Sequence, residues 1–350
     1  MALTTLVPGE SLCRFEMPRM WKGMAQPRHM AKPLGSAAAV IMAFRTLARR
    51  TPARWTFGRR TSGNLRAISS DGLFTLPDNA KVALEILGGA AKAGTSKVTL
   101  VCVHGSYHAA WCYDQFFLDF FREKGFNAYA VSLRGQGKGK VEEQKGVAGT
   151  LEEHAADVAS FVADLERQGQ RVVLLGHSFG GLITLQAAAN LQNLAGLVLL
   201  CSVPPSGNVG IILRSLFRAP LQAFRITWGF ISRSFERDAD LCQEIFFDKE
   251  TPLRKVEEYM QLMKKGCPEG TRLLDLRQLQ KSLPVPICTK PVLVIGGAED
   301  AVVDVEALQE TAESHNVKPL ILDGVPHDAM LGSKWTSAAE AILDWLKDRE

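Results

Sequence analysis

Short runs of valine, leucine and isoleucine recur along the chain after residue 80, and most are followed by a stretch with helical spacing of apolar positions. Runs this continuous are typical of strands that are buried on both faces. The predicted strands are 81–87, 97–105, 127–133, 171–177, 194–202, 291–297 and 318–324, and the predicted helices are 111–124, 151–168, 179–191, 304–314 and 334–348. This alternation predicts an α/β protein with a mostly parallel, doubly wound sheet and helices on both of its faces.

The alternation is interrupted once, after the fifth predicted strand. The sequence there is helical and amphipathic, and prolines stand at both of its ends. We therefore predict a helical cap over residues 204–284, inserted into a core formed by residues 71–203 and 285–350. The cap is expected to cover the carboxyl edge of the sheet, because ligands bind at that edge in open α/β folds. Large apolar side chains such as Phe224 and Trp228 are candidates to line a hydrophobic pocket there.

The stretch VVLLGHSFGGLITLQAAA, residues 172–189, places three glycines and one serine between a predicted strand and a predicted helix. Glycine weakens a strand interior, so this break indicates a very tight bend of the backbone. Strand, Gly-x-Ser-x-Gly and helix, in this order, are typical of a nucleophile elbow, in which strained backbone angles expose the serine oxygen. We therefore predict that Ser178 is a nucleophile, with the positive end of the next helix beside it.

A serine hydroxyl is a poor nucleophile until a base takes its proton. With this kind of elbow, the expected chain order is serine, then acid, then histidine. Two histidines follow Ser178: His315 lies at the polar end of a predicted helix, and His327 lies in the loop after the last predicted strand. A side chain in that loop reaches the carboxyl edge of the sheet, so we predict that His327 is the general base.

The base needs an acid that orients its ring and stabilises its protonated form. The sixth predicted strand is followed by the sequence AEDA, in which Asp300 is the predicted acid. Glu299 and Asp304 are the alternatives. Asp328 is the immediate neighbour of His327 but stands in the wrong chain order.

Acyl transfer also needs two backbone N–H groups that stabilise the negative oxygen of the intermediate. One is expected from Phe179, the residue after the nucleophile. The other is expected from the loop after the second predicted strand, at Ser106. We predict that His104 in this loop is structural and holds the loop backbone by hydrogen bonds.

Charge is distributed unevenly within the net charge of +4: residues 1–70 hold 12 lysines and arginines but 2 acids, and the remainder holds 29 and 35. Such a basic, acid-poor start is typical of transit peptides and predicts a leader for a plastid or mitochondrion. The alternative is a disordered tail on a cytoplasmic protein.

The acidic composition of the remainder argues against nucleic-acid binding. No apolar run reaches the ~20 residues of a membrane span. The scattered cysteines form no CxxC metal motif. No cofactor and no oligomeric state are predicted.

Five motifs together resemble the α/β-hydrolase superfamily, in its serine-triad branch of esterases and lipases. They are HGSYHAAW (104–111), SLRGQGKG (132–139), GHSFGG (176–181), GGAEDAVV (296–303) and GVPHDAML (324–331). The resemblance covers roughly residues 75–350 and implies the α/β-hydrolase fold. It also implies the triad Ser178, Asp300 and His327, with Ser106 and Phe179 as the oxyanion pair. The implied activity is hydrolysis of a carboxylic ester through an acyl-enzyme.

The substrate stays open, because one fold hosts many chemistries. The apolar cap favours a hydrophobic or lipid-like ester. Dehalogenases and epoxide hydrolases carry an aspartate at the elbow, and hydroxynitrile lyases carry a lysine where this chain has Asp328, so the sequence argues against those classes. Carbon–carbon bond hydrolases share the serine triad, and some non-catalytic small-molecule receptors share the fold. Both remain alternatives.

Overall fold

The computed structural model describes residues 68–350, apart from residues 93, 95, 140–145, 269 and 275–287. Nearly all of the predicted leader and the last part of the predicted cap lie outside these described residues. Within them, no helix combines the length and the apolar character that crossing a membrane requires. The cysteines among them are free thiols, at positions 102, 112, 201, 242, 267 and 288.

The described residues form one sheet of eight strands in the order β1-β2-β4-β3-β5-β6-β7-β8. The strands are β1 Leu73–Thr75, β2 Ala83–Gly89, β3 Val98–Val103, β4 Asn127–Ser132, β5 Arg171–His177, β6 Gly196–Leu200, β7 Val292–Gly297 and β8 Leu320–Leu322. In this spatial order, every neighbouring pair from β4 through β3 to β8 is parallel. Strands β1 and β2 form an antiparallel hairpin, and β2 pairs with β4, also antiparallel. The prediction of a mostly parallel sheet is confirmed.

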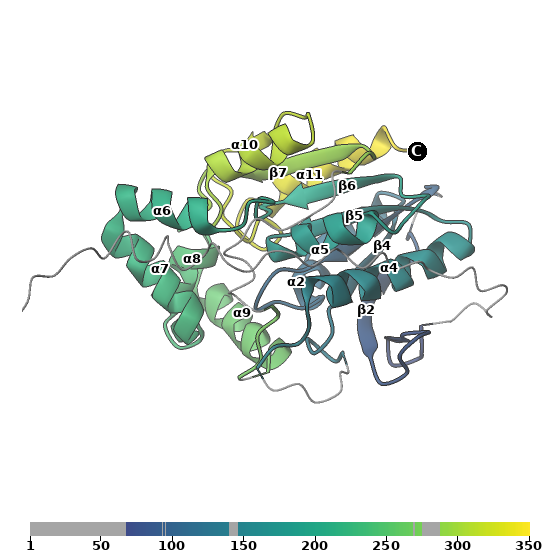
Figure 1. Cartoon of the computed structure of the whole chain (residues 1–350), viewed down its shortest axis with the longest axis horizontal. Coiled ribbons are helices and arrows are strands. Elements are labelled where there is room, and N and C mark those ends of the chain that lie inside the picture. The colour runs from purple at the N-terminus through teal and green to yellow at the C-terminus, as the bar shows by residue number, and fades with distance from the viewer. Residues whose placement is uncertain (1–67, 93, 95, 140–145, 269, 275–287) are drawn as a thin grey trace, which may run out of the picture. The chain divides into compact units, whose positions relative to one another are not determined.

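Helices cover both faces of the sheet (Figure 1). They are α2 Trp111–Asp114, α3 Phe117–Glu123, α4 Leu151–Arg167, α5 Phe179–Ala188, α10 Val305–Ser314 and α11 Trp335–Lys347. The single helix predicted over 111–124 is in fact two, because Phe116 leaves the helical conformation at φ −146°. Its ring stacks on Trp335 of α11, with the ring centroids 4.8 Å apart.

Two apolar cores lie on opposite faces of the sheet, as alternate residues of β3 show. Leu100 and Cys102 belong to the core that includes α3 and α11, whereas Val101 and Val103 belong to the core that includes α4, α5 and α10. All four side chains are fully buried. This burial on both faces explains why the strand sequences are continuously apolar rather than alternating.

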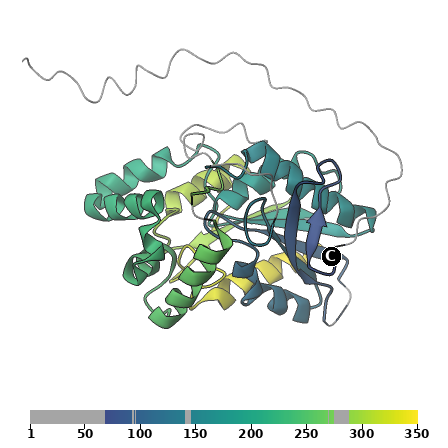
Figure 2. The ribbon, with the colours of Figure 1, turned by 90° about the horizontal axis from the view of Figure 1, so that it is seen from below.

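Between β6 and β7 the chain forms a run of helices, here called the α6–α9 segment, which gathers at one side of the sheet (Figures 1 and 2). It comprises α6 Val209–Arg218, α7 Pro220–Ser232, the 3-10 turn Ser234–Glu236, α8 Ala239–Phe246 and α9 Leu253–Gly266. Two contacts place it at the carboxyl edge of the sheet. Tyr107, in the loop after β3, donates its hydroxyl to the carbonyl of Phe230 at 2.6 Å. The N–H of Asp328, in the loop after β8, donates to the carbonyl of Phe246 at 2.9 Å.

Phe224 and Trp228, two of the candidates to line a pocket, are exposed in the structure. Their rings stack on each other at a centroid distance of 6.4 Å, and they are 67% and 56% exposed. Helix α7 instead buries its small residues Ala223 and Gly229. A Cβ atom on Gly229 would lie 3.0 Å from Ile245 of α8, so close helix packing selects the small face and leaves the large side chains outside.

Candidate active site

Ser178 lies between β5 and α5 with φ 54° and ψ −122°, a backbone conformation that residues other than glycine rarely adopt. Backbone hydrogen bonds hold it there: its N–H donates to the carbonyl of Leu200 at 3.1 Å, and its own carbonyl accepts from Val203 and Gly181. Strain of this kind persists only where the surroundings impose it. The serine is 4% exposed, at the carboxyl end of the central strands.

The glycines of the elbow are required by the space around them. A Cβ atom on Gly180 would lie 2.5 Å from the carbonyl oxygen of Val103 and 2.6 Å from that of His104. A Cβ atom on Gly181 would lie 2.0 Å from the hydroxyl of Ser202. The start of α5 therefore packs directly against the end of β3 and the loop after β6, which fixes the position of Ser178.

Asp300 and His327 come together from the loops after β7 and β8. Asp300 Oδ2 lies 2.8 Å from His327 Nδ1, and both side chains are almost completely buried. Asp300 Oδ1 accepts the backbone N–H groups of Val302 and Val303 at 2.7 and 2.8 Å, which fix the carboxylate. Because a carboxylate only accepts, Nδ1 carries the proton, and Nε2 is left as the nitrogen that can take another.

The alternative acids and the alternative base lie elsewhere. Glu299 is exposed. Asp304 caps α10 and binds Arg214 through both carboxylate oxygens at 2.6 Å. His315 ends α10, and its Nδ1 lies 3.1 Å from the hydroxyl of Ser314. The structure brings none of them to His327.

The environment of His327 adjusts its basicity. Burial alone would lower its pKa, but the negative charge and hydrogen bond of Asp300, with a further contribution from Asp328, raise the pKa above its ordinary value. A histidine whose pKa is raised is a stronger base and takes a proton from a hydroxyl group more readily.

The elbow and the histidine loop meet through His177. Its Nε2 lies 2.9 Å from the carbonyl oxygen of His327, and the two ring centroids are 4.8 Å apart. Ser178 and the His327 ring share no hydrogen bond in this structure. Such bonds are often long without substrate and tighten in the reacting complex.

The two predicted oxyanion donors flank the nucleophile. Phe179 is the first residue of α5, so its N–H has no acceptor within the helix. Ser106 follows Gly105, which approaches the elbow so closely that a Cβ atom there would lie 2.8 Å from Ser178 Cβ. His104 holds this loop, as predicted: its Nδ1 lies 2.8 Å from the carbonyl oxygen of Gly105, and its Nε2 accepts the N–H of Leu133. Burial lowers the pKa of His104 to about 3, which keeps the ring neutral.

Aromatic residues of the α6–α9 segment pack against the same loops. Tyr107 adopts a left-handed backbone, φ 65°, and its ring contacts Phe230 and Phe235 at centroid distances of 5.8 and 5.0 Å. Phe246 lies with its ring centroid 6.3 Å from that of His327. An aromatic ring of the α6–α9 segment therefore lies beside the histidine.

Sequence reasoning missed a second buried histidine–carboxylate pair behind this site. His108 Nε2 lies 2.8 Å from Asp328 Oδ2, and both side chains are at most 1% exposed. His177 Nε2 lies 3.9 Å from the other oxygen of Asp328. The signal was present in the motifs HGSYHAAW and GVPHDAML, but only the fold shows that these two loops meet.

One group of side chains in the described residues has the spacing of a loose metal site: His177, Cys201 and His327 offer donor atoms within 4.8 Å of one another. The chemistry of these donors does not favour a metal. Each histidine already has another partner: Nε2 of His177 donates to the carbonyl oxygen of His327. Asp300 already engages Nδ1 of His327.

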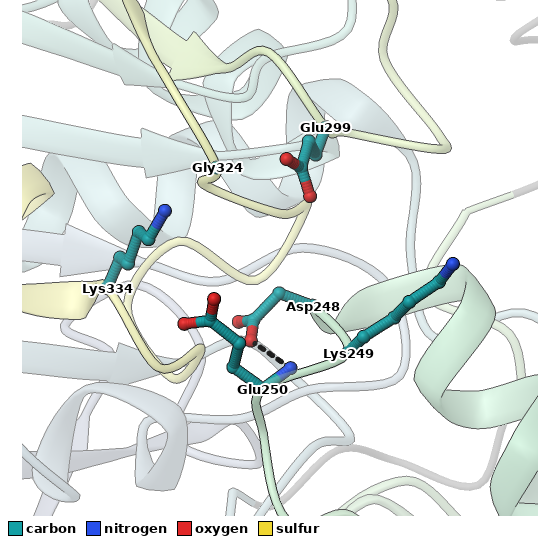
Figure 3. A pocket seen from close by; sticks show the side chains of 6 residues that line it. All are labelled: Asp248, Lys249, Glu250, Glu299, Gly324 and Lys334. Atoms are coloured by element: carbon teal, nitrogen blue, oxygen red, sulfur yellow. Dashed lines mark hydrogen bonds between the residues drawn. The ribbon is translucent and has the colours of Figure 1, made fainter.

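The structure has a polar hollow of about 450 Å³, shown in Figure 3. Its lining residues are Asp248, Lys249, Glu250, Glu299, Gly324 and Lys334. Both oxygens of Asp248 already accept hydrogen bonds from neighbouring loop groups. None of the lining residues is Ser178, Asp300 or His327, so the hollow is not the site built around the elbow.

Comparison with known sequences agrees with the fold. The sequence model of the alpha/beta hydrolase family matches residues 100–343. Esterase PIR7B of Oryza sativa subsp. japonica is 35% identical over 92 residues, which are 26% of this chain and 32% of that protein. "Probable esterase PIR7A" of Oryza sativa subsp. indica is 31% identical over 121 residues, which are 34% of this chain and 44% of that protein. The aligned regions thus span less than half the length of these curated relatives.

Solved structures share the fold. A thermophilic esterase from Thermogutta terrifontis superposes with a TM-score of 0.56 at 20% identity, covering 79% of this chain and 98% of the esterase. Esterase RhEst1 from Rhodococcus sp. ECU1013 gives a TM-score of 0.54 at 19% identity, covering 80% of this chain and 100% of the other. Similarity at such identities concerns architecture, and function has to be argued from the site.

Proposed function

Because this chain belongs to the alpha/beta hydrolase family, we propose that it is a serine hydrolase that cleaves a carboxylic ester through an acyl-enzyme. Ser178 is the nucleophile, His327 the general base and Asp300 the residue that orients it. The observation that carries the proposal is the buried Asp300–His327 hydrogen bond of 2.8 Å beside a serine held at φ 54°. A strained nucleophile and an oriented base are the two parts that serine catalysis requires.

In the proposed reaction, Ser178 Oγ attacks the ester carbonyl carbon while His327 Nε2 takes the hydroxyl proton. The carbonyl oxygen becomes negative and accepts hydrogen bonds from the N–H groups of Ser106 and Phe179. His327 then returns the proton to the departing alcohol oxygen, and the acyl group remains on Ser178. Water then attacks the acyl carbon while His327 takes a proton from it. The bond between that carbon and Ser178 Oγ breaks, His327 returns the proton to Ser178 Oγ, and the carboxylic acid leaves.

The proposed substrate is a hydrophobic ester. Its support is the aromatic cluster of Tyr107, Phe230 and Phe246, which reaches the ring of His327, since small-molecule sites are lined mostly by apolar and aromatic side chains. The rice relatives are named as esterases, which agrees with an ester as substrate.

Two further parts of the chain have proposed roles. The α6–α9 segment forms the greater part of the proposed cap, residues 204–284. Its contacts with Tyr107 and Asp328 at the carboxyl edge of the sheet support this role.

Residues 1–70 act as a leader for a plastid or mitochondrion, supported by their basic, acid-poor composition. A fluorescent reporter fused to residues 1–70 is expected in one of these organelles, and a purely cytosolic signal would refute the leader.

Hydrolysis of p-nitrophenyl esters of graded chain length tests the proposed activity. The wild-type chain is expected to release nitrophenol with a burst equal to the enzyme present, because the acyl-enzyme accumulates. Ser178→Ala is expected to lose the burst and to retain only a small remainder, since catalysis without a triad member persists at about 10³–10⁴-fold over water. Hydrolysis that survives Ser178→Ala unchanged would refute the assignment.

A further inference from the structure

We propose that His108 and Asp328 are positioning residues, a buried ion pair that ties the oxyanion loop to the catalytic histidine. The inference rests on the proposed function, in which His327 is the base and Ser106 an oxyanion donor. It assigns a purpose to the histidine–carboxylate pair that the triad itself does not use.

Each ring nitrogen of His108 has a hydrogen-bond partner. Nδ1 lies 2.9 Å from the carbonyl oxygen of Ser106, and Nε2 lies 2.8 Å from Asp328 Oδ2. A carbonyl oxygen only accepts, so Nδ1 carries a proton, and the pair shares a second proton on the other side of the ring. His108 therefore holds Ser106 with one nitrogen and the histidine loop with the other.

His177 closes the arrangement from the elbow. Its Nε2 donates to the carbonyl oxygen of His327, and its Nδ1 is buried without a partner. Burial, with the nearby ring of His327, lowers the pKa of His177 to about 3, so this ring stays neutral. The loops that carry Ser106, Ser178 and His327 thus meet through two histidines and Asp328.

The pair also acts on His327 by charge. Burial alone would raise the pKa of Asp328, but His108 in contact, with His177 and His327 nearby, holds that pKa below its ordinary value. Asp328 is therefore an anion next to the base and contributes to the raised pKa of His327. The other ionisable groups that face Asp328 are Cys112, Tyr113, Cys201, Cys242 and Tyr259, and burial raises the pKa of each, so they are uncharged.

Stability alone does not explain such a pair. Removing two charges from water costs about as much as their attraction returns, and well-packed apolar residues often serve equally well. Ser106 and His327 must, however, stand in a fixed relation to one ester carbonyl, and a hydrogen-bonded bridge between their loops supplies it.

The test compares Asp328→Asn, His108→Gln and the double variant, each normalised to active enzyme by fluorophosphonate titration. We expect kcat to fall about 10–100-fold in each single variant with KM little changed, because small misplacement of a reacting group costs rates of this order. The double variant is expected to lose far less than the product of the single losses, since the partners act as a unit. Full additivity would overturn the pair.

The pH profile separates positioning from mere structure. In Asp328→Asn the acidic limb of kcat/KM is expected to move to lower pH by about 0.5 or more, because His327 loses a neighbouring negative charge. Asp157→Asn is the matched control, as Asp157 is also buried and ion-paired, with Arg134 of the loop after β4 at 2.6 Å. The control is expected to melt at lower temperature with an unmoved limb. An unmoved limb in Asp328→Asn would overturn the proposal.

A substrate-free measurement distinguishes this failure from failure of the proposed function. NMR titration of the His327 ring, assigned with a His327→Gln variant, is expected to give a lower pKa in Asp328→Asn than in the wild type. That shift, together with an inactive wild type, would refute the hydrolase while leaving the electrostatic coupling intact. An unchanged His327 pKa would refute the coupling even in an active enzyme.

Discussion

At the scale of single residues, the two oxygens of Asp300 have separate partners. One oxygen accepts two backbone N–H groups and the other faces His327 Nδ1. The backbone bonds therefore fix the carboxylate independently of its contact with His327. Glu299, one position earlier, is exposed and lines the polar hollow. A shift of one residue along this loop therefore separates an orienting acid from a solvent-facing one.

Asp300→Asn is expected to lower kcat by about 10³–10⁴-fold, because the amide no longer holds the correct tautomer of His327. Glu299→Gln is the matched control and is expected to change kcat less than about twofold. Steady-state hydrolysis of one nitrophenyl ester measures both. A larger loss in Glu299→Gln would mean that the acid is misassigned.

His327 must be neutral to take the serine proton, so activity is expected to rise with pH through the pKa of this residue. That pKa is raised, which places the acidic limb of kcat/KM above the ~6.5 of an unperturbed histidine. A pH series on wild-type enzyme with one ester locates the limb. A limb well below 6.5 would contradict the raised pKa.

The sequence predicted the residues that belong to a linear motif and missed those that do not. Ser178, Asp300 and His327 are each predicted from the motif and the chain order around them, and the structure brings the predicted acid to the predicted base. Asp328 was set aside for its chain order. Its meeting with His108 joins residues 220 positions apart, which only the packed sheet reveals.

At the scale of elements, helix α7 shows how packing overrides composition. Its aromatic residues predict an inward face, but Gly229 fits closely against α8 and turns Phe224 and Trp228 outward. Phe230 is the half-buried aromatic residue of α7, and it contacts Tyr107 and Phe246. One sequence gives the apolar positions of a helix but not which of them its neighbours admit.

Phe230→Ala is therefore expected to change the ratio of kcat/KM between long-chain and short-chain esters by about tenfold. This is within the range that the loss of a few methylene contacts produces. Phe224→Ala, on the exposed side of the same helix, is expected to leave the ranking unchanged. Relative kcat/KM values for acetate, butyrate and octanoate esters measure this. Equal scaling of all esters in Phe230→Ala would indicate lost stability rather than lost selection.

Gly180→Ala is expected to destabilise the fold by about 1–3 kcal/mol or more, because the added carbon meets two backbone carbonyls that cannot move aside. Gly210→Ala in α6 meets only the end of the Arg214 side chain, and the better helix propensity is expected to stabilise by about 0.5–1 kcal/mol. Urea unfolding monitored by circular dichroism compares the two. A neutral Gly180→Ala would show that the elbow is less tightly packed than this structure has it.

At the scale of the whole molecule, the unit Ser62–Glu350 contains the sheet, both cores and every candidate site residue. The sequence predicted seven of the eight strands and missed β1, because its three residues are too short for any periodicity. The order of the strands and the antiparallel hairpin could not be predicted from the sequence either, since strand pairing depends on contacts between residues distant in sequence.

Removing residues 1–61 is expected to leave ester hydrolysis within about twofold of the full chain. The physical reason is that the remaining unit keeps Ser69, whose hydroxyl bonds the backbone of Leu73 in β1. Activity and melting temperature of the truncated chain, compared with the full chain, measure the effect. A truncation that is insoluble or inactive would show that the removed residues are part of the folded unit.

The most direct test of the account is the site at which a fluorophosphonate reacts. Intact mass spectrometry followed by peptide mapping is expected to show one adduct per chain, on Ser178, formed faster as pH rises through the His327 pKa. Asp300→Asn is expected to react far more slowly, and Ser178→Ala not at all, while both remain folded by circular dichroism. An adduct on a different serine, or none on a folded wild-type chain, would contradict the central claim that Ser178 is an activated nucleophile.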